Sequence, residues 1–342
     1  MDELAVKGKL WKKNVILPAL AIVTFTLSWA GAFPQAIVEK WFSRTLYPGI
    51  SIAARMFADA ATFAWLDIII PLGLTLLVIA VHQRRFYLLA NVLAILYLIF
   101  FWSWGLNYHR EPLASKVPYD SQATDNAAIE RFAKETAEQL NRLYVEKERQ
   151  VVDDARVRQE AVERVRRVAA VIDGAEWQGP SRIKNSFFAN PWFHAAGIDG
   201  VFNLFAQEPL VNNTLLEFEK PFVMTHELAH VYGYAGEGDA NLIAVFATLA
   251  SADPHFQYSG WMNLWLYIRS GKVDALLEPG PRRDFDSMIR RMRSEQIRWI
   301  TAIQGTILDW YLKSNSVEEG IRSYSQVVLL AAGTEAYWDR FR

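Results

Sequence analysis

The clearest chemical pattern in this chain is the segment THELAH at residues 225–230. Pro221 can open a helix just before it, because proline lacks the N–H group that the first helical turn leaves unpaired in any case. On such a helix His226 and His230 lie four residues apart, so both imidazoles emerge on one face, one turn apart. Two neutral imidazoles at this spacing can ligate one Zn²⁺ ion, and the spacing therefore predicts a metal site on a helix.

Glu227 directly follows the first histidine and lies about 100° further around the helix. From there its carboxylate can accept a proton from a water molecule at the open position of the metal, as a general base does. The alternative is a pair of histidines that only satisfy a hydrogen-bonding network on a buried helix. We favour the zinc site, because H-E-x-x-H combines two ligands and a base in one short motif.

A catalytic zinc ion needs a third protein ligand and one open position. The chain has no cysteine, so histidine and carboxylate must supply every ligand. A glycine-rich turn follows the motif, and the next residues, EGDAN at 237–241, precede an apolar run. We expect this run to form a second helix that packs against the first and brings its N-terminal carboxylates toward the histidines. Glu237 and Asp239 are both candidates for the third ligand.

Hydrolysis of a peptide bond also needs a hydrogen-bond donor for the oxyanion that develops during the reaction. Tyr258 lies beyond the expected second helix and is our candidate for this catalytic role. The alternative for Tyr258 is a structural role in a helix-capping turn. Weaker candidates for the same role are His255, Arg322 and Tyr324.

H-E-x-x-H followed by E-x-x-A-N on a second helix resembles the gluzincin metallopeptidases, in which the first glutamate of the second element is the third zinc ligand. Carried over to this chain, the resemblance implies Glu237 as that ligand, with Asp239 as a carboxylate beside it. In gluzincin-like folds an edge strand next to the motif helix pairs with an extended substrate, and residues 200–205 are a candidate for that strand. An ordinary buried strand is the equal alternative.

More closely, the chain resembles a bacterial family of membrane-anchored metallopeptidase-like proteins, the domain-of-unknown-function 3810 family. Its members have N-terminal spans and a His-Glu-x-x-His segment that runs into a Glu-x-x-Ala-Asn helix. The matching stretches are residues 197–203, 221–241, 256–260 and 311–324. The chain departs from the pattern at Gly238-Asp239, where the family is expected to have an acidic pair, so Asp239 stays the alternative third ligand.

The elements that position the motif fall into two parts of different composition. Residues 1–106 contain nine Lys and Arg and five Asp and Glu, about 13% charged, whereas residues 107–342 are about 25% charged, as soluble domains are. Each of three apolar runs is long enough to cross a hydrocarbon core roughly 30 Å thick. We therefore interpret residues 1–106 as a membrane anchor and residues 107–342 as the zinc metallopeptidase-like domain. The expected transmembrane helices are residues 14–33, 61–81 and 86–106.

Basic residues indicate the orientation of this anchor. Four lysines precede the first run, and Arg84 and Arg85 lie in the short loop between the second and third runs. The positive-inside rule places both on the cytoplasmic side, so three spans put the metallopeptidase-like domain in the extracytoplasmic or periplasmic space. A signal peptide is the alternative for the first run, but the length of that run favours a retained anchor. Asp67 lies near the outer end of the second run, where we expect it at the membrane interface.

The sequence predicts a mainly α protein with three N-terminal transmembrane helices and an α+β gluzincin-like domain that contains a small sheet. We expect charge-rich helices over residues 122–148 and 154–172. The expected function is zinc-dependent hydrolysis of peptides or envelope proteins at the cell (inner) membrane, with the lipid bilayer as a partner. A net charge of −1 argues against nucleic acid as a partner. The alternatives are a non-catalytic zinc-binding scaffold domain of a cell-envelope assembly and, less favoured, a transporter component.

Overall fold

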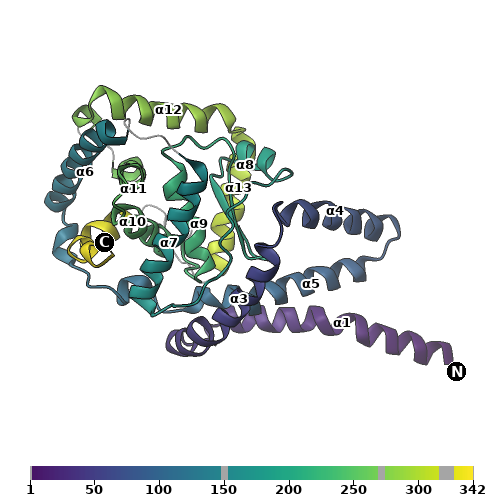
Figure 1. Cartoon of the computed structure of the whole chain (residues 1–342). Coiled ribbons are helices and arrows are strands. Elements are labelled where there is room, and N and C mark those ends of the chain that lie inside the picture. Colours follow the sequence, from purple (N-terminus) through teal and green to yellow (C-terminus); the bar gives the residue numbers. More distant parts are fainter. Residues whose placement is uncertain (1, 148–152, 269–273, 316–326, 342) are drawn as a thin grey trace.

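A computed structural model describes residues 2–147, 153–268, 274–315 and 327–341 of the chain. Figure 1 shows a helical body from which three long helices project in one direction. They are α1 (Asp2–Trp29), α4 (Leu66–His82) and α5 (Phe86–Ser103), and the N-terminus lies at the far tip of α1. Over these described residues the protein is mainly helical and has one small sheet, as predicted.

The three projecting helices occupy the three apolar runs of the sequence. α5 packs against both α1 and α4, and large apolar side chains such as Leu74 and Leu93 stay exposed. Among the described residues, α5 alone has the length and composition to cross a membrane. α4 has 17 residues, and the apolar part of α1, Val15–Trp29, is shorter still. One candidate span is therefore found, and three spans stay a prediction.

The segment between the first two projecting helices belongs to the body. Residues 34–59 fold as α2 (Gln35–Ile37), the π-helical η1 (Val38–Leu46) and α3 (Tyr47–Ala58). The Tyr47 side chain is fully buried, and its hydroxyl donates to the carbonyl of Val231 at 2.7 Å. The chain re-enters the body after α5 through η2 (Gly105–His109), which is largely buried. The compositional border near residue 107 therefore cuts through elements that pack together.

The centre of the body is α10 (Glu237–Leu249), almost every residue of which is buried. Around it pack α7 (Asp154–Asp173), α9 (Lys220–Val231), α11 (Pro254–Ile268) and α14 (Val327–Thr334). α7 buries one apolar stripe, including Val157, Val165 and Val168, and carries most of its charged side chains on its other faces, as an amphipathic helix does. The outer elements are α6 (Asn126–Lys147), α8 (Asn190–Ala196), α12 (Pro279–Glu295), α13 (Arg298–Ser314), η3 (Leu113–Ser115), η4 (Ser121–Thr124), η5 (Asp274–Leu276) and η7 (Glu335–Phe341).

The sheet consists of two antiparallel strands, β1 (Gly200–Asn203) and β2 (Glu208–Val211), both of which pack on α9. Glu208 is completely buried, and its carboxylate accepts a hydrogen bond from Nζ of Lys184 at 2.8 Å. The same carboxylate accepts from the N–H of Leu66 at 3.2 Å. The buried carboxylate of Glu208, paired with Lys184, therefore joins the sheet to the first residue of α4.

Asp67, in the first turn of α4, makes a second connection to the body. Its carboxylate accepts hydrogen bonds from the Ser186 hydroxyl at 2.6 Å and from the N–H groups of Phe187 and Phe188 at 3.0 and 2.9 Å. The acidic residue inside the second apolar run thus fastens the start of α4 to the loop before α8. The N-terminal end of α4 is fixed at the surface of the body.

Candidate metal centre

The H-E-x-x-H segment lies on α9, in the helical form that its spacing predicts. Pro221 occupies the first turn, where no N–H is needed, and the Ser259 hydroxyl accepts a hydrogen bond from the free N–H of Phe222 at 3.0 Å. After α9 ends, Gly233 has φ = 78°, a left-handed conformation that glycine adopts without a steric penalty. This reversal folds α10 back against α9 and brings its first residue, Glu237, beside the motif.

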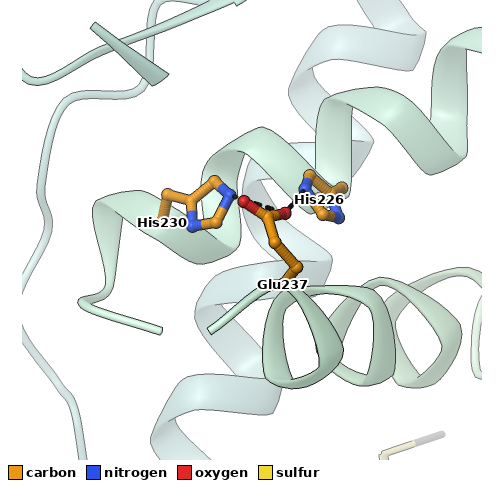
Figure 2. A group of neighbouring side chains, drawn as sticks. All are labelled: His226, His230 and Glu237. Carbon is orange, nitrogen blue, oxygen red and sulfur yellow. Dashed lines mark ion pairs between the residues drawn. The ribbon is translucent and has the colours of Figure 1, made fainter. Parts of the chain in front are cut away.

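Figure 2 shows His226 and His230 on one face of α9, with the carboxylate of Glu237 reaching between them from the start of α10. Oε2 of Glu237 lies 3.2 Å from Nε2 of His226 and 3.7 Å from Nε2 of His230. One candidate ligand atom from each of the three residues lies within 4.8 Å of the other two. The three side chains are mostly buried, so the group forms a compact site with little solvent around it.

The far nitrogen of each imidazole is held by an oxygen acceptor. Nδ1 of His230 lies 2.8 Å from the carbonyl oxygen of Tyr234, and Nδ1 of His226 lies 2.8 Å from Oδ1 of Asn241. Because a carbonyl oxygen can only accept, Nδ1 must carry the proton, and in a neutral imidazole Nε2 then carries the lone pair. In the neutral form that metal binding requires, both histidines therefore direct an Nε2 lone pair toward Glu237, as in metal sites whose histidines are oriented by hydrogen bonds at the other ring nitrogen.

The electrostatics of the site favour a positive charge at this point. Burial opposes the charged form of His230, but the contact with Glu237 outweighs it and raises the pKa of His230 to about 9. Burial alone would raise the pKa of Glu237, yet the two histidines hold it well below its ordinary value. Oε2 of Glu237 is nevertheless buried without a hydrogen-bond partner among the described residues. A cation held by all three residues would satisfy that oxygen.

Glu227 lies beside this group and does not join it. Its side chain is buried against β1, at the point where Gly200 leaves no side chain; a Cβ atom there would collide with Oε1 of Glu227. Burial raises the pKa of Glu227 to about 7, and the nearby Glu237 adds to the effect while the two histidines oppose it. A carboxylate with a pKa near neutrality can both take up and release a proton under physiological conditions.

These residues open onto a cavity of about 520 Å³. Its walls include β1, the motif face of α9, the end of α11 and the inner face of α13. Several lining residues had no pattern in the sequence by which they could be found. They are Trp104, Tyr108, Asn263, Tyr267, Gln304 and Tyr311.

Trp104 connects the cavity to the end of α5. Its indole N–H donates to the carbonyl of His230 at 2.9 Å, and its ring packs against those of Phe202 and His230. Next to Trp104, with the ring centroids 5.5 Å apart, Tyr108 donates to the hydroxyl of Tyr311 at 3.3 Å. The candidate metal centre therefore lies next to the residues with which α5 enters the body.

The structure separates the two carboxylates that compete for the ligand role. Glu237 faces the histidines, whereas the carboxylate of Asp239 accepts from the N–H of Leu113 at 3.2 Å and lies outside the ligand group. Burial raises the pKa of Asp239 to about 6.

Tyr258 is placed away from the cavity. Its hydroxyl donates to Asp284 at 2.8 Å, and its ring packs near Tyr144 and Phe218, so the oxyanion role predicted for it has no geometric basis here. His255 is buried at the start of α11 and does not line the cavity either. Arg322 and Tyr324 lie outside the described residues.

A buried ion cluster supports the turn between α9 and α10. Arg110 donates to the carbonyls of Tyr232 and Gly233 at 3.3 and 3.1 Å, and to carboxylates of Glu39 and Asp173 at 2.8–3.1 Å. The guanidinium also lies over the ring of Tyr234, 4.7 Å from its centroid. Arg110 thus holds the backbone whose carbonyl orients His230.

One family profile, described as "Protein of unknown function (DUF3810)", matches residues 42–332. No curated protein and no solved structure shows a significant match to the chain. The matched region begins in η1 and ends in α14, so it includes the candidate metal centre, the cavity walls and the helices α4 and α5. Because this match covers most of the chain, the chain belongs to the DUF3810 family.

Proposed function

We propose that this protein is a membrane-anchored zinc-dependent peptidase, with His226, His230 and Glu237 as metal ligands and Glu227 as general base. One observation carries the proposal: two oriented Nε2 atoms and one buried carboxylate oxygen, which has no hydrogen-bond partner among the described residues, meet at a single point beside a cavity. Two histidines and a glutamate are a catalytic ligand set, because they leave a coordination position open. When bound there, Zn²⁺ polarises a carbonyl and makes a water molecule acidic.

The residues of the chain supply the remaining steps. Glu227 takes the proton of the attacking water on its buried carboxylate and returns it to the leaving amine. Tyr267 lines the same cavity, and burial raises its pKa to about 12, so its hydroxyl stays protonated and can donate to an oxyanion. It takes the role that the sequence suggested for Tyr258.

The sheet offers a place for an extended peptide. Within the described residues β1 pairs only with β2, and Gly200, Val201 and Phe202 line the cavity. A substrate strand that adds to the cavity side of β1 would gain main-chain hydrogen bonds with little side-chain selectivity. A peptide seated there lies next to Glu227, which touches Gly200.

We further propose that α1, α4 and α5 all span the cell membrane, with the N-terminus in the cytoplasm and the body outside. The exposed apolar side chains of the three helices and the basic residues at Arg84 and Arg85 support this topology. Peptides or envelope proteins close to the membrane surface are then the substrates within reach.

The test uses full-length protein in detergent. We expect about one Zn²⁺ per chain by elemental analysis. Wild type should hydrolyse casein or an envelope-protein extract, and Glu227→Gln should keep the zinc while losing roughly 100-fold or more of the rate. Stoichiometric zinc with no hydrolysis by wild type would reject the peptidase and favour the scaffold alternative. Absence of zinc would reject both.

A further inference from the structure

An exposed apolar face runs along α13, on the side opposite the cavity. Trp299, Ile303, Ile307 and Trp310 are 65%, 47%, 54% and 67% exposed. With Ala302 and Thr306 they occupy one arc of roughly 140° at 100° per residue, and between residues 299 and 310 this arc contains no charged side chain. We call these six residues the α13 face. Isolated exposed apolar residues are common, whereas a continuous face of this kind marks an interaction surface.

The position of α13 is fixed relative to the projecting helices. At its N-terminal end, the N–H of Ile297 and the Thr301 hydroxyl donate to the carbonyl of Ala195 in α8, at 2.9 and 3.3 Å. α8 follows the loop that holds Asp67 at the start of α4. At the other end of α13, the ring of Tyr311 packs 6.1 Å from that of Phe100, in the last turn of α5. α13 therefore extends between elements that meet the outer ends of α4 and α5.

Figure 1 shows α13 and α8 on the side of the body from which α1, α4 and α5 project. If those helices cross a bilayer, the α13 face is at the level of its surface. We infer that the α13 face lies in the outer headgroup region of the same bilayer, so that α13 is an interfacial helix. This inference rests on the membrane anchoring in the proposed function and is independent of zinc and of hydrolysis.

The composition of α13 suits a lipid surface. Tryptophan stands near each end of the face, and aromatic rings of this kind favour the membrane–water interface. Arg298 precedes the face and Lys313 follows it. Both side chains are long enough to reach lipid phosphates while their stems stay in the apolar region, although Lys313 also pairs with Asp309 at 2.7 Å. Phe187 and Phe188, 78% and 51% exposed beside the start of α4, extend the apolar surface on the same side.

The inner face of the same helix lines the cavity, through Gln304, Leu308 and Tyr311. α13 would thus form a wall between the candidate metal centre and the bilayer surface. When α13 lies in the headgroup region, the cavity lies next to the membrane. This position restricts substrates to polypeptide segments at the membrane surface.

The absence of cysteine makes the test direct, since each introduced cysteine is unique. Ile303→Cys and Ile307→Cys carry an environment-sensitive fluorophore, in full-length protein reconstituted in nanodiscs of phosphatidylethanolamine and phosphatidylglycerol. Leu93→Cys, exposed at the middle of α5, is the reference for the bilayer core; Val145→Cys, exposed on α6, is the reference for water. Circular dichroism verifies that each variant is folded.

Nitroxide-labelled lipids then report the depth of each label. Labels at residues 303 and 307 should lose roughly half of their emission to lipids with a nitroxide near the headgroup, as for side chains about 5–10 Å deep. The label at residue 145 should lose none, and the label at residue 93 should be quenched best by nitroxides deep in the chains. Glu227→Gln should leave every value unchanged.

Quenching at residue 93 without quenching at residues 303 and 307 would overturn the inference and leave the anchoring intact. No quenching at any of the three would overturn both. Blue-shifted emission at residues 303 and 307 that lipid nitroxides do not quench would show that a protein, such as a second copy of this chain, covers the face instead.

Discussion

At the scale of single residues, the two carboxylates at the start of α10 differ in direction rather than in chemistry. Glu237 and Asp239 are two positions apart, about 200° around a helix, so only one of them can face α9. The structure turns Glu237 toward the histidines and Asp239 toward the backbone of Leu113. Sequence alone left the choice open, because the rotation of α10 depends on its burial on all sides by the body.

This difference predicts the zinc content of two matched variants. Glu237→Gln should lower zinc affinity by roughly 100-fold or more, because the anionic ligand is lost. Asp239→Asn should keep about one zinc ion per chain, since the Asp239 carboxylate accepts a hydrogen bond from the N–H of Leu113 and is not one of the three ligands. Titration with a zinc chelator, followed by elemental analysis, measures both. Equal losses in the two variants would contradict the assignment of Glu237.

The direction of a side chain around its helix also explains why Tyr258 lies away from the cavity. Tyr258 and Tyr267 are nine positions apart on α11, which puts them about 180° apart around the helix. The face that carries Tyr258 packs toward Tyr144 of α6, and this leaves Tyr267 at the cavity. The spacing of His226, Glu227 and His230 could be read from the sequence because it is local. The tyrosine could not, because its direction is set by tertiary packing.

At the scale of elements, β1 and α9 approach closely because residue 200 has no side chain. A Cβ atom at Gly200 would collide with the carboxylate of Glu227, so this carboxylate must move if the glycine is replaced. The sequence indicated a turn and a short strand here, but the contact with the motif is a long-range property. Likewise, residues 34–59 lie between the first two expected spans, and no local pattern in the sequence indicates the contact of Tyr47 with the end of α9.

We expect Gly200→Ala to reduce hydrolysis by roughly 10- to 100-fold, since a general base displaced by a fraction of an ångström loses its alignment. Zinc content should remain near that of wild type, because none of the three ligands touches Gly200. Gly49→Ala is the control, as its Cβ would meet no atom within 4 Å. Steady-state rates on one peptide substrate, with zinc measured on the same samples, decide the question. A rate equal to that of Gly49→Ala would show that this contact does not position Glu227.

At the scale of the whole molecule, one ion cluster, buried except for Arg44, joins segments that lie far apart in the chain. It consists of Glu39 and Arg44 in η1, Arg110 after η2, Lys116 after η3 and Asp173 at the end of α7. Through Arg110 it also holds the turn that orients His230. Composition placed Glu39 in the anchor and Asp173 in the zinc metallopeptidase-like domain. The ion pairs join these two parts of the chain through Arg110.

The cluster makes stability depend on pH in a defined direction. Burial raises the pKa of Glu39, but Arg110, Lys116 and Arg44 outweigh it and lower the pKa from 4.5 to about 2. A carboxylate whose pKa is lower in the folded state stabilises the fold fully above its unfolded pKa. That contribution is lost as the pH falls through the folded pKa, here between pH 4.5 and pH 2.

Wild type in detergent should therefore lose on the order of 3 kcal/mol of unfolding free energy through Glu39 as the pH falls across this window. Glu39→Gln should be less stable at neutral pH and show a flatter decline, because the group that takes up the proton is gone. Denaturant unfolding followed by circular dichroism at several pH values measures both slopes. Glu163→Gln, on the exposed side of α7, is the control and should decline as steeply as wild type. The unfolding free energy of Glu39→Gln could instead fall with pH as steeply as that of wild type. The acid sensitivity would then arise from other carboxylates, and the ion cluster would not hold η1 to the body in the way the structure implies.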